Sequence, residues 1–254
     1  MNIKMIAVDL DGTLFTEAKT VTPRTLSALA KCREMGIKVV FATGRGPSSG
    51  ALLPVEHFDG YAVNNGAQVY VDGELVYDKV LPHAAYGGLI AALCQAGVRC
   101  AIVAKGKHVM NFDAPAEWEG FIYTRVTDAE FMAITADAEK VWAVADSPEV
   151  VSLIREYVTE EMFLYIARDD FALMSHRDAI KSKALAALAE RWGIDSEEIV
   201  VFGDDMNDLC MFAYAGTAVA MGNALDEVKA AADMVCGTNE EDGIAVWIET
   251  HVLG

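Results

Sequence analysis

Short, almost wholly apolar runs alternate with longer amphipathic stretches through the first and last parts of the chain. Residues 3–8 and 37–42 are two such runs, and runs of this kind are typical of strands buried on both faces of a sheet. Between them, Thr22-Pro23 has the residue types of a helix start and Gly36 those of a helix end. The strand–helix–strand order predicts a parallel sheet with a right-handed crossover.

The same pattern continues beyond these elements and returns at the end of the chain. Residues 61–63 resume the strand pattern, and the runs 67–71 and 74–77, joined by Asp72-Gly73, predict a hairpin. The remaining predicted elements of this kind are a helix over 181–192, strands over 199–202 and 217–221, a helix over 224–232 capped by Asn223, and a helix over 240–251, which a short apolar pair at 234–235 precedes.

The middle of the chain has a different texture, with helices and strands mixed in β-rich units. Here we expect helices over 84–96, 127–135 and 148–158, and strands over 98–104, 108–112, 140–145 and twice within 162–175. The sequence therefore predicts an α/β core with a Rossmann-like parallel sheet flanked by helices, formed by residues 1–81 and 176–254. Residues 82–175 are predicted to be an inserted α+β domain.

Composition narrows the partners and the compartment. The 254 residues include 20 Lys and Arg against 38 Asp and Glu, a net charge of −18, which argues against nucleic acid as a partner but not against a small phosphorylated molecule. The five cysteines have no CxxC spacing, as expected in a reducing compartment. No signal-peptide pattern and no apolar run of about 18 residues is present, so we expect a cytoplasmic protein without membrane contact. The sequence leaves monomer and dimer open.

Two carboxylates, Asp9 and Asp11, directly follow the first predicted strand. Open α/β sheets carry their chemistry at such strand ends, and a divalent cation is the simplest partner for two like charges this close. The side chains converge only if the chain turns after Leu10, which Gly12 permits. One carboxylate would then attack as a nucleophile and the other would move protons. The alternative is an Asx turn in which Asp and Gly only shape the loop.

Further polar groups follow later strands. Thr43 and Gly44 come after the run 37–42, and a hydroxyl beside free backbone N–H groups suits a phosphoryl oxygen. Lys181 begins a predicted helix, where the helix dipole disfavours a cation, and a bound anion would resolve that conflict. Gly203-Asp204-Asp205-Met206-Asn207-Asp208 follows a strand and offers only hard oxygen donors, which is typical of a Mg²⁺ site.

This set of motifs resembles the haloacid dehalogenase (HAD) superfamily phosphatases, specifically the Cof-type subfamily with a type IIB cap domain. The resemblance extends from residue 3 to about residue 245. The motifs that carry it are Asp9-Leu10-Asp11-Gly12-Thr13, Ala42-Thr43-Gly44-Arg45, Asn65-Gly66-Ala67, Lys181-Ser182-Lys183-Ala184-Leu185, Gly203 to Asp208, and Ala220-Met221-Gly222-Asn223-Ala224.

The resemblance implies a Mg²⁺-dependent phosphatase acting through an aspartyl-phosphate. Asp9 would attack phosphorus, and Asp11 would protonate the leaving alcohol and then activate water. Thr43 and Lys181 would hold the phosphoryl oxygens. The implied metal ligands are Asp9, the backbone carbonyl of Asp11, and Asp204. The remaining implied site residues are Leu10, Gly44 and Asn207 for phosphate, and Gly12, Thr13, Asp205 and Asp208 in supporting positions.

Three further expectations follow from the resemblance. Asp11 would need a raised pKa to act as an acid near neutral pH, which burial beneath a closed second domain would supply. The family usually has Gly after the motif lysine, where this chain has Ser182; the Ala184-Leu185 spacing favours Lys181 over Lys183 as that lysine.

Residues 82–175 would be the cap that selects the substrate. Its candidate contacts, each of which is also an ordinary surface or core residue, are Arg99, Lys105, Lys107, His108, Glu117, Trp118 (chiefly a packing residue) and Arg177.

Other functions remain compatible with parts of the sequence. A phosphomutase of the same superfamily would return the phosphoryl group to a second hydroxyl. A non-catalytic phosphometabolite-binding regulator should have lost Asp9, Asp11 or Lys181, and all three are present. A Rossmann oxidoreductase is disfavoured because no G-x-G-x-x-G follows the first strand.

Overall fold

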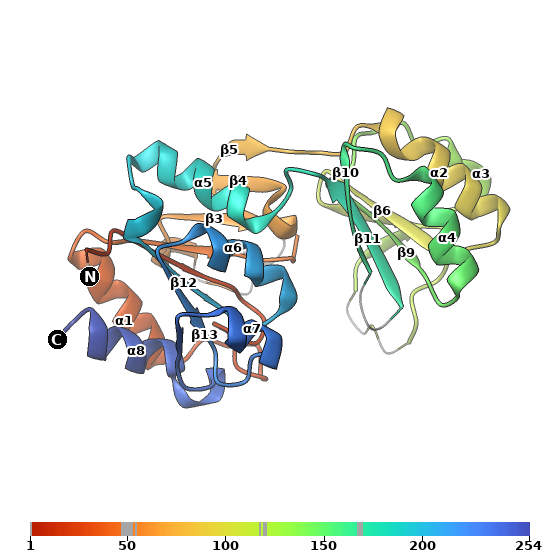
Figure 1. Ribbon diagram of the computed structural model, residues 1–254. Coiled ribbons are helices and arrows are strands. Elements are labelled where there is room, and N and C mark those ends of the chain that lie inside the picture. Colours follow the sequence, from red (N-terminus) through yellow and green to blue (C-terminus); the bar gives the residue numbers. More distant parts are fainter. Residues whose placement is uncertain (1, 47–52, 54, 117, 119–120, 167–169) are drawn as a thin grey trace. The chain divides into compact units, whose positions relative to one another are not determined.

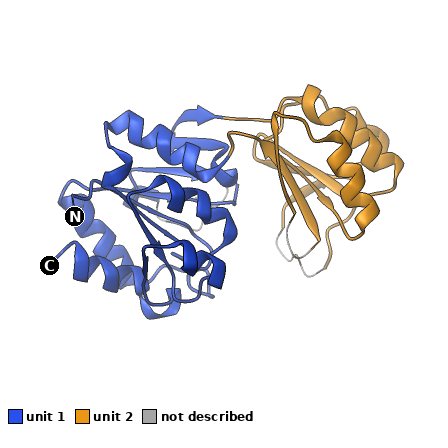
Figure 2. Ribbon diagram, in the orientation of Figure 1, with its two compact units in different colours: residues 1–78, 180–254 blue, residues 79–179 orange. Residues whose placement is uncertain are grey.

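The protein, described here from a computed structural model, divides into two compact units. Unit 1 comprises residues 1–78 and 180–254, and unit 2 comprises residues 79–179 (Figure 2). The structure describes residues 2–46, 53, 55–116, 118, 121–166 and 170–254. Unit 2 is thus an insertion between two segments of one α/β core, and its bounds lie within four residues of the predicted 82–175.

Unit 1 is built on an eight-stranded sheet with the order β14-β13-β12-β1-β2-β3-β4-β5. The six strands from β14 to β3 pair in parallel, and β4 and β5 add an antiparallel hairpin at one edge. The strands span Met5–Val8 (β1), Lys38–Ala42 (β2), Gly60–Val63 (β3), Gln68–Val71 (β4), Glu74–Asp78 (β5), Ile199–Gly203 (β12), Thr217–Ala220 (β13) and Met234–Val235 (β14). The predicted α/β fold with a parallel-rich sheet is confirmed.

Helices cover both faces of this sheet (Figure 1). They are α1 (Pro23–Glu34), α5 (Lys181–Trp192), α6 (Leu209–Tyr214), α7 (Asp226–Ala231) and α8 (Gly243–His251). Helix α1 packs against α8, and α5 packs against α6. Crossovers from β1 to β2 and from β12 to β13 run in opposite directions along the sheet, so right-handedness places α1 and α6 on opposite faces. The central strands are consequently buried, and β1 is wholly inaccessible.

Unit 2 is an α+β layer whose six strands have the order β10-β11-β9-β6-β7-β8. All of its pairs are antiparallel except β7 with β8. Its elements are α2 (His83–Gln95), β6 (Cys100–Ala104), β7 (Lys107–Met110), β8 (Tyr123–Arg125), α3 (Asp128–Met132), β9 (Lys140–Val144), α4 (Pro148–Tyr157), β10 (Met162–Ile166) and β11 (Phe171–His176).

The two faces of the unit 2 sheet differ in what covers them. Ile102 and Ala143 pack in a core with α2 and α4, whereas their neighbours Ala101 and Trp142 belong to a second cluster rich in aromatic rings. This alternation follows the two-residue period of a strand. Trp118 packs against Trp142 with ring centroids 5.8 Å apart, so the prediction that it is a packing residue is confirmed.

Two local predictions were wrong or incomplete. Strand β8 was not predicted, because three residues give too short a pattern to detect. Asn223 does not cap the following helix, which begins at Asp226 rather than residue 224. Its amide instead donates to the Gly12 carbonyl at 2.7 Å, and its oxygen accepts from the Asn239 N–H at 3.1 Å. Asn223 therefore ties loops together instead of starting a helix.

A helix that crosses a bilayer must be both long and apolar. Within the described part of the chain, no helix combines the length and the apolar character that a transmembrane span requires.

Candidate active site

Four adjacent parallel strands of unit 1 end at the same edge of the sheet and carry the predicted polar loops. Strands β12, β1, β2 and β3 are neighbours, and their carboxyl ends lead into Asp204, Asp9, Thr43 and Asn64 respectively. Parallel strands direct their carboxyl ends to one edge, which explains why segments far apart in sequence meet here.

Lys181 lies at the centre of this arrangement, between two carboxylates. Its Nζ is 2.6 Å from Asp9 Oδ1 and 2.7 Å from Asp208 Oδ1. All three residues are buried, with 1%, 6% and 0% exposure for Lys181, Asp9 and Asp208. Lys181 is a cation at the start of α5, and the carboxylates of Asp9 and Asp208 offset its charge. Lys183, on the same helix, is exposed.

Asp208 is held in place by backbone donors. Its Oδ2 accepts from the N–H groups of Asp204 and Asp205 at 2.9 and 3.1 Å. Asp205 accepts from the Met206 N–H at 2.7 Å and so shapes the short turn Met206–Asp208. Asp208 therefore orients Lys181, while Asp205 stabilises the loop that carries Asp208.

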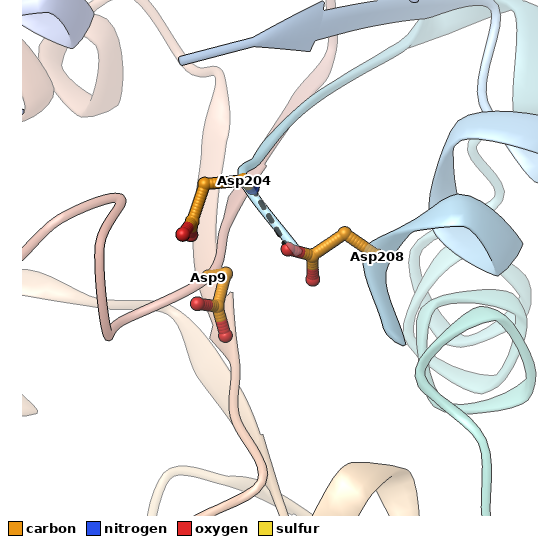
Figure 3. A group of neighbouring side chains, drawn as sticks. All are labelled: Asp9, Asp204 and Asp208. Carbon is orange, nitrogen blue, oxygen red and sulfur yellow. Dashed lines mark hydrogen bonds between the residues drawn. The ribbon is translucent and has the colours of Figure 1, made fainter. Parts of the chain in front are cut away.

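Asp204 approaches Asp9 from the end of β12 (Figure 3). The buried Thr13 hydroxyl donates to Asp204 Oδ1 at 2.6 Å. Gly12 has a φ of +77° and faces Asp204 so closely that a Cβ at residue 12 would collide with Asp204 Oδ2. Gly12 is therefore required both for the turn after Asp11 and for the approach of Asp204.

The buried charges of this cluster do not balance. Oxygens of Asp9, Asp204 and Asp208 lie within 4.8 Å of one another, and Lys181 supplies a single positive charge. Burial raises the pKa of Asp9 to about 7; the Lys181 ammonium opposes this shift and the other two carboxylates add to it. Burial likewise raises the pKa of Asp204 to about 6, against the hydrogen bond from Thr13.

A divalent cation fits this donor set. Three carboxylates and one ammonium leave two excess negative charges, which a 2+ ion offsets, and Asp9 and Asp204 offer the hard oxygens that Mg²⁺ prefers. Histidine and cysteine, which would favour zinc, do not occur in the cluster that the described residues form.

These shifts predict a pH-dependent stabilisation by Mg²⁺. Both folded-state pKa values exceed the ordinary 3.8. Without metal, protonation of Asp9 and Asp204 therefore stabilises the fold fully below pH about 4, and this stabilisation is lost as the pH rises through 6 and 7. Mg²⁺ binds the ionised carboxylates, so we expect it to raise the melting temperature more at pH 8 than at pH 5. Each kcal/mol corresponds to about 2–4 °C for a chain of this size.

Differential scanning fluorimetry with Mg²⁺ or chelator at the two pH values checks this expectation. Asp204→Asn should remove most of the difference. An equal rise at both pH values, or none at either, would contradict the assignment.

Asp11 does not join the carboxylate cluster. Arg45 donates to both of its oxygens at 2.6 Å, and Lys19 Nζ lies 2.8 Å from Oδ1. Burial acts to raise the pKa of Asp11, but these hydrogen bonds and charges outweigh it and lower the pKa to about 2. The expectation of a raised pKa is therefore wrong for this structure. Nothing in the residue pattern indicated that Arg45 and Lys19 would contact Asp11.

The Thr43-Gly44 loop lies beside the turn after β3. The buried Thr43 Oγ1 accepts from the Arg45 N–H at 3.1 Å, and a Cβ on Gly44 would stand 3.0 Å from Asn65 Oδ1. Asn207 Nδ2 donates to that same oxygen at 3.3 Å. Leu10 is buried, and its carbonyl accepts from the Phe15 N–H at 2.8 Å.

Sequence reasoning missed Arg45 and Asn65 as members of the site. Both stand in the motifs that carry the family resemblance, but no role was assigned to them. A signal was present, because each directly follows or precedes glycine in a loop after a strand. Among the cap candidates, Glu117 lies outside the described residues.

Comparison with known proteins agrees with this geometry. Residues 6–248 match the family model of haloacid dehalogenase-like hydrolases. A 5-amino-6-(5-phospho-D-ribitylamino)uracil phosphatase of Bacillus subtilis is 28% identical over 261 residues, covering 100% of this chain and 97% of the relative. A pyridoxal phosphate phosphatase of Escherichia coli is 30% identical over 283 residues, covering all of both chains.

Solved structures extend the likeness to three dimensions. A haloacid dehalogenase-like hydrolase from Bacteroides thetaiotaomicron superposes with a TM-score of 0.84 at 28% identity, covering 98% of this chain and 99% of the other. A sugar phosphatase of HAD subclass IIB has a TM-score of 0.84 at 25% identity, covering 97% and 98%. Each of these alignments covers nearly the whole of this chain and so includes residues of both units.

Proposed function

Because this chain belongs to the haloacid dehalogenase-like hydrolases, we propose that it is a Mg²⁺-dependent phosphatase of small phosphorylated metabolites that acts through an aspartyl-phosphate. The observation that carries the proposal is the state of Asp9. Its carboxylate is buried, bonded to Lys181 through one oxygen, and close to Asp204. A carboxylate held this way has a fixed orientation and a cation beside it, as a nucleophile requires.

Charge is the main obstacle to this chemistry. An anionic nucleophile and a phosphate dianion repel each other, and Lys181 offsets one charge beside Asp9. Asp9, Asp204 and the Asp11 carbonyl would hold Mg²⁺, which when bound polarises the phosphoryl oxygens and neutralises the developing charge. Asp208 keeps the Lys181 ammonium in place.

The protein residues complete a balanced double displacement. Asp9 forms a bond to phosphorus as the ester P–O bond breaks, and Asp11 gives a proton to the leaving alcohol. Asp11 then takes a proton from water, whose oxygen attacks phosphorus and releases Asp9 and inorganic phosphate. Thr43, Gly44, Lys181 and Asn207 would hold the phosphoryl oxygens. Asp11 must leave Arg45 and Lys19 and take up a proton from solvent before the first step, because both of its oxygens are occupied and these cations lower its pKa.

The substrate is a small phosphomonoester, and sugar phosphates are the first class to be tested. We assign substrate choice to unit 2, which we propose to be the cap. Two of the relatives act on phosphate esters of heterocyclic compounds, and unit 2 carries an aromatic cluster on one sheet face. Phosphate esters of heterocyclic compounds should therefore be assayed as substrates together with sugar phosphates. The five cysteines are free thiols, which fits a cytoplasmic enzyme.

A phosphomutase and a non-catalytic phosphometabolite-binding regulator are the alternatives. A mutase would transfer the phosphoryl group from Asp9 to a second hydroxyl of the substrate instead of to water. A regulator would bind phosphate esters without turning them over.

The test is an assay of inorganic phosphate release from p-nitrophenyl phosphate, sugar phosphates and pyridoxal phosphate, each with Mg²⁺ and with chelator. We expect phosphate release that depends on Mg²⁺ and falls at least about a hundredfold with chelator, a loss of roughly 2.7 kcal/mol of barrier lowering. Full activity in chelator would overturn the metal dependence. Isomerised sugar phosphate without phosphate release would identify a mutase, and binding without reaction would identify a regulator.

A further inference from the structure

The turn after β3 has an unusual backbone. Asn64, Asn65 and Gly66 all have positive φ angles, of +52°, +58° and +94°. Side-chain-bearing residues adopt this region rarely, and two in succession persist only where the surroundings fix them. Such concentrations of backbone strain occur at functional sites, and this turn lies at the same sheet edge as Asp9 and Thr43.

Two hydrogen bonds hold one side of the turn, and the other side lies close to the start of α5. The Asn64 N–H donates to the Arg45 carbonyl at 2.7 Å, and the Asn65 N–H donates to the Thr43 carbonyl at 2.8 Å. On the other side, a Cβ on Gly66 would lie 2.5 Å from the Ile180 carbonyl oxygen and 3.0 Å from the Lys181 nitrogen. The turn therefore joins the loop after β2 to the start of the helix that carries Lys181.

The Asn65 side chain points into the gap between two loops of the site. Its Oδ1 accepts from Asn207 Nδ2 at 3.3 Å and packs against the backbone of Gly44, which has no room for a larger residue. This hydrogen bond orients the Asn207 amide with its nitrogen toward Asn65.

We propose that Asn65 is a positioning residue that sets the distance and orientation of Asn207 relative to the Thr43-Gly44 loop, and so preforms the phosphoryl pocket. This inference rests on the proposed function, in which those two loops hold the phosphoryl group. Asparagine suits the role on two counts: it tolerates positive φ, and its neutral oxygen accepts a hydrogen bond without placing a second negative charge beside a phosphate dianion.

The decisive variant is Asn65→Gly, which removes the amide but keeps a residue that adopts positive φ freely. We expect kcat/KM for p-nitrophenyl phosphate to fall about 10- to 100-fold, the usual effect of losing an orienting contact. The inhibition constant of inorganic phosphate should rise by a similar factor, with the melting temperature nearly unchanged. Asn65→Asp, which keeps the acceptor but adds charge, should weaken phosphate binding further than Asn65→Gly.

A double-variant cycle distinguishes positioning from a general structural role. If Asn65 acts through Asn207, then Asn65→Gly in an Asn207→Ala background should have little further effect on phosphate binding. Asp72→Gly is the matched control, because Asp72 has a φ of +53° in the exposed turn between β4 and β5. Asp72→Gly should leave kcat/KM for p-nitrophenyl phosphate and the inhibition constant of inorganic phosphate at the wild-type values.

Additive losses in the cycle, or wild-type phosphate inhibition in Asn65→Gly, would overturn the inference. Isothermal titration with inorganic phosphate and Mg²⁺ makes the same comparison without turnover. If the wild type binds phosphate but hydrolyses no ester, the proposed function fails while the positioning role is still decided by this titration.

Discussion

Replacing Asp9 by Asn should lower phosphatase activity by at least about 10³-fold, which corresponds to roughly 4 kcal/mol of lost barrier lowering. The amide cannot attack phosphorus as a carboxylate does, and the proposed mechanism assigns no other nucleophile. The oxygen that accepts from Lys181 Nζ at 2.6 Å is retained in Asn, so the orientation of the side chain survives.

The fold should tolerate this change well. Asp9 is one of three clustered carboxylates that share the single charge of Lys181, and burial already favours its neutral form. Removing one negative charge relieves repulsion from Asp204 and Asp208. In chelator at pH 8, the melting temperature of Asp9→Asn should therefore equal or exceed that of the wild type.

Steady-state kinetics and differential scanning fluorimetry on the same preparations check both expectations. Asp72→Asn is the matched control, because it makes the same chemical change in an exposed turn. Retained activity in Asp9→Asn would refute the nucleophile assignment. A large fall in its melting temperature would refute the charge imbalance on which the Mg²⁺ proposal depends.

The sequence was most informative where a signal repeated along the chain. Apolar runs followed directly by Asp9, Thr43 and Asp204 predicted strand ends that share an edge, and the structure places those strands side by side. Gly12 was recognised as a turn residue, although its close approach to Asp204 depends on two segments 192 positions apart and could not be inferred from local sequence.

The partners of the charged groups were not predictable in the same way. Asp11 was expected to have a raised pKa, but Arg45 and Lys19 hold it as a carboxylate. Local patterns fix where a residue stands along an element, whereas long flexible side chains choose partners from the whole neighbourhood. The cap showed a similar limit, since the three residues of β8 gave no pattern and pair only because β7 lies beside them.

Replacing Lys181 by Met should cost both stability and activity. Methionine fills a similar volume but leaves Asp9 and Asp208 buried without their cation, and breaking such a buried ion pair typically costs about 3–5 kcal/mol. At about 2–4 °C per kcal/mol, the melting temperature in chelator at pH 8 should fall by about 6–20 °C. Activity should fall at least about 10²-fold, because the proposed cation beside the phosphoryl oxygens is lost.

A second change separates the two effects. Asp208→Asn in the Lys181→Met background removes one of the stranded charges while the backbone N–H groups of Asp204 and Asp205 still have an acceptor. We expect this double variant to recover part of the melting temperature but none of the activity. Recovery of both would mean that Lys181 serves only to neutralise Asp208.

Lys183→Met is the control that the sequence itself supplies. Ser182 stands where the family usually has glycine, which leaves two lysines eligible for the motif, and only Lys181 is buried against carboxylates. Lys183 is exposed on the same helix, so its replacement should change stability by no more than about 0.5 kcal/mol. Kinetics and thermal melts of the two single variants decide which lysine contacts the phosphoryl group. An inactive Lys183→Met beside an active Lys181→Met would assign that contact to Lys183.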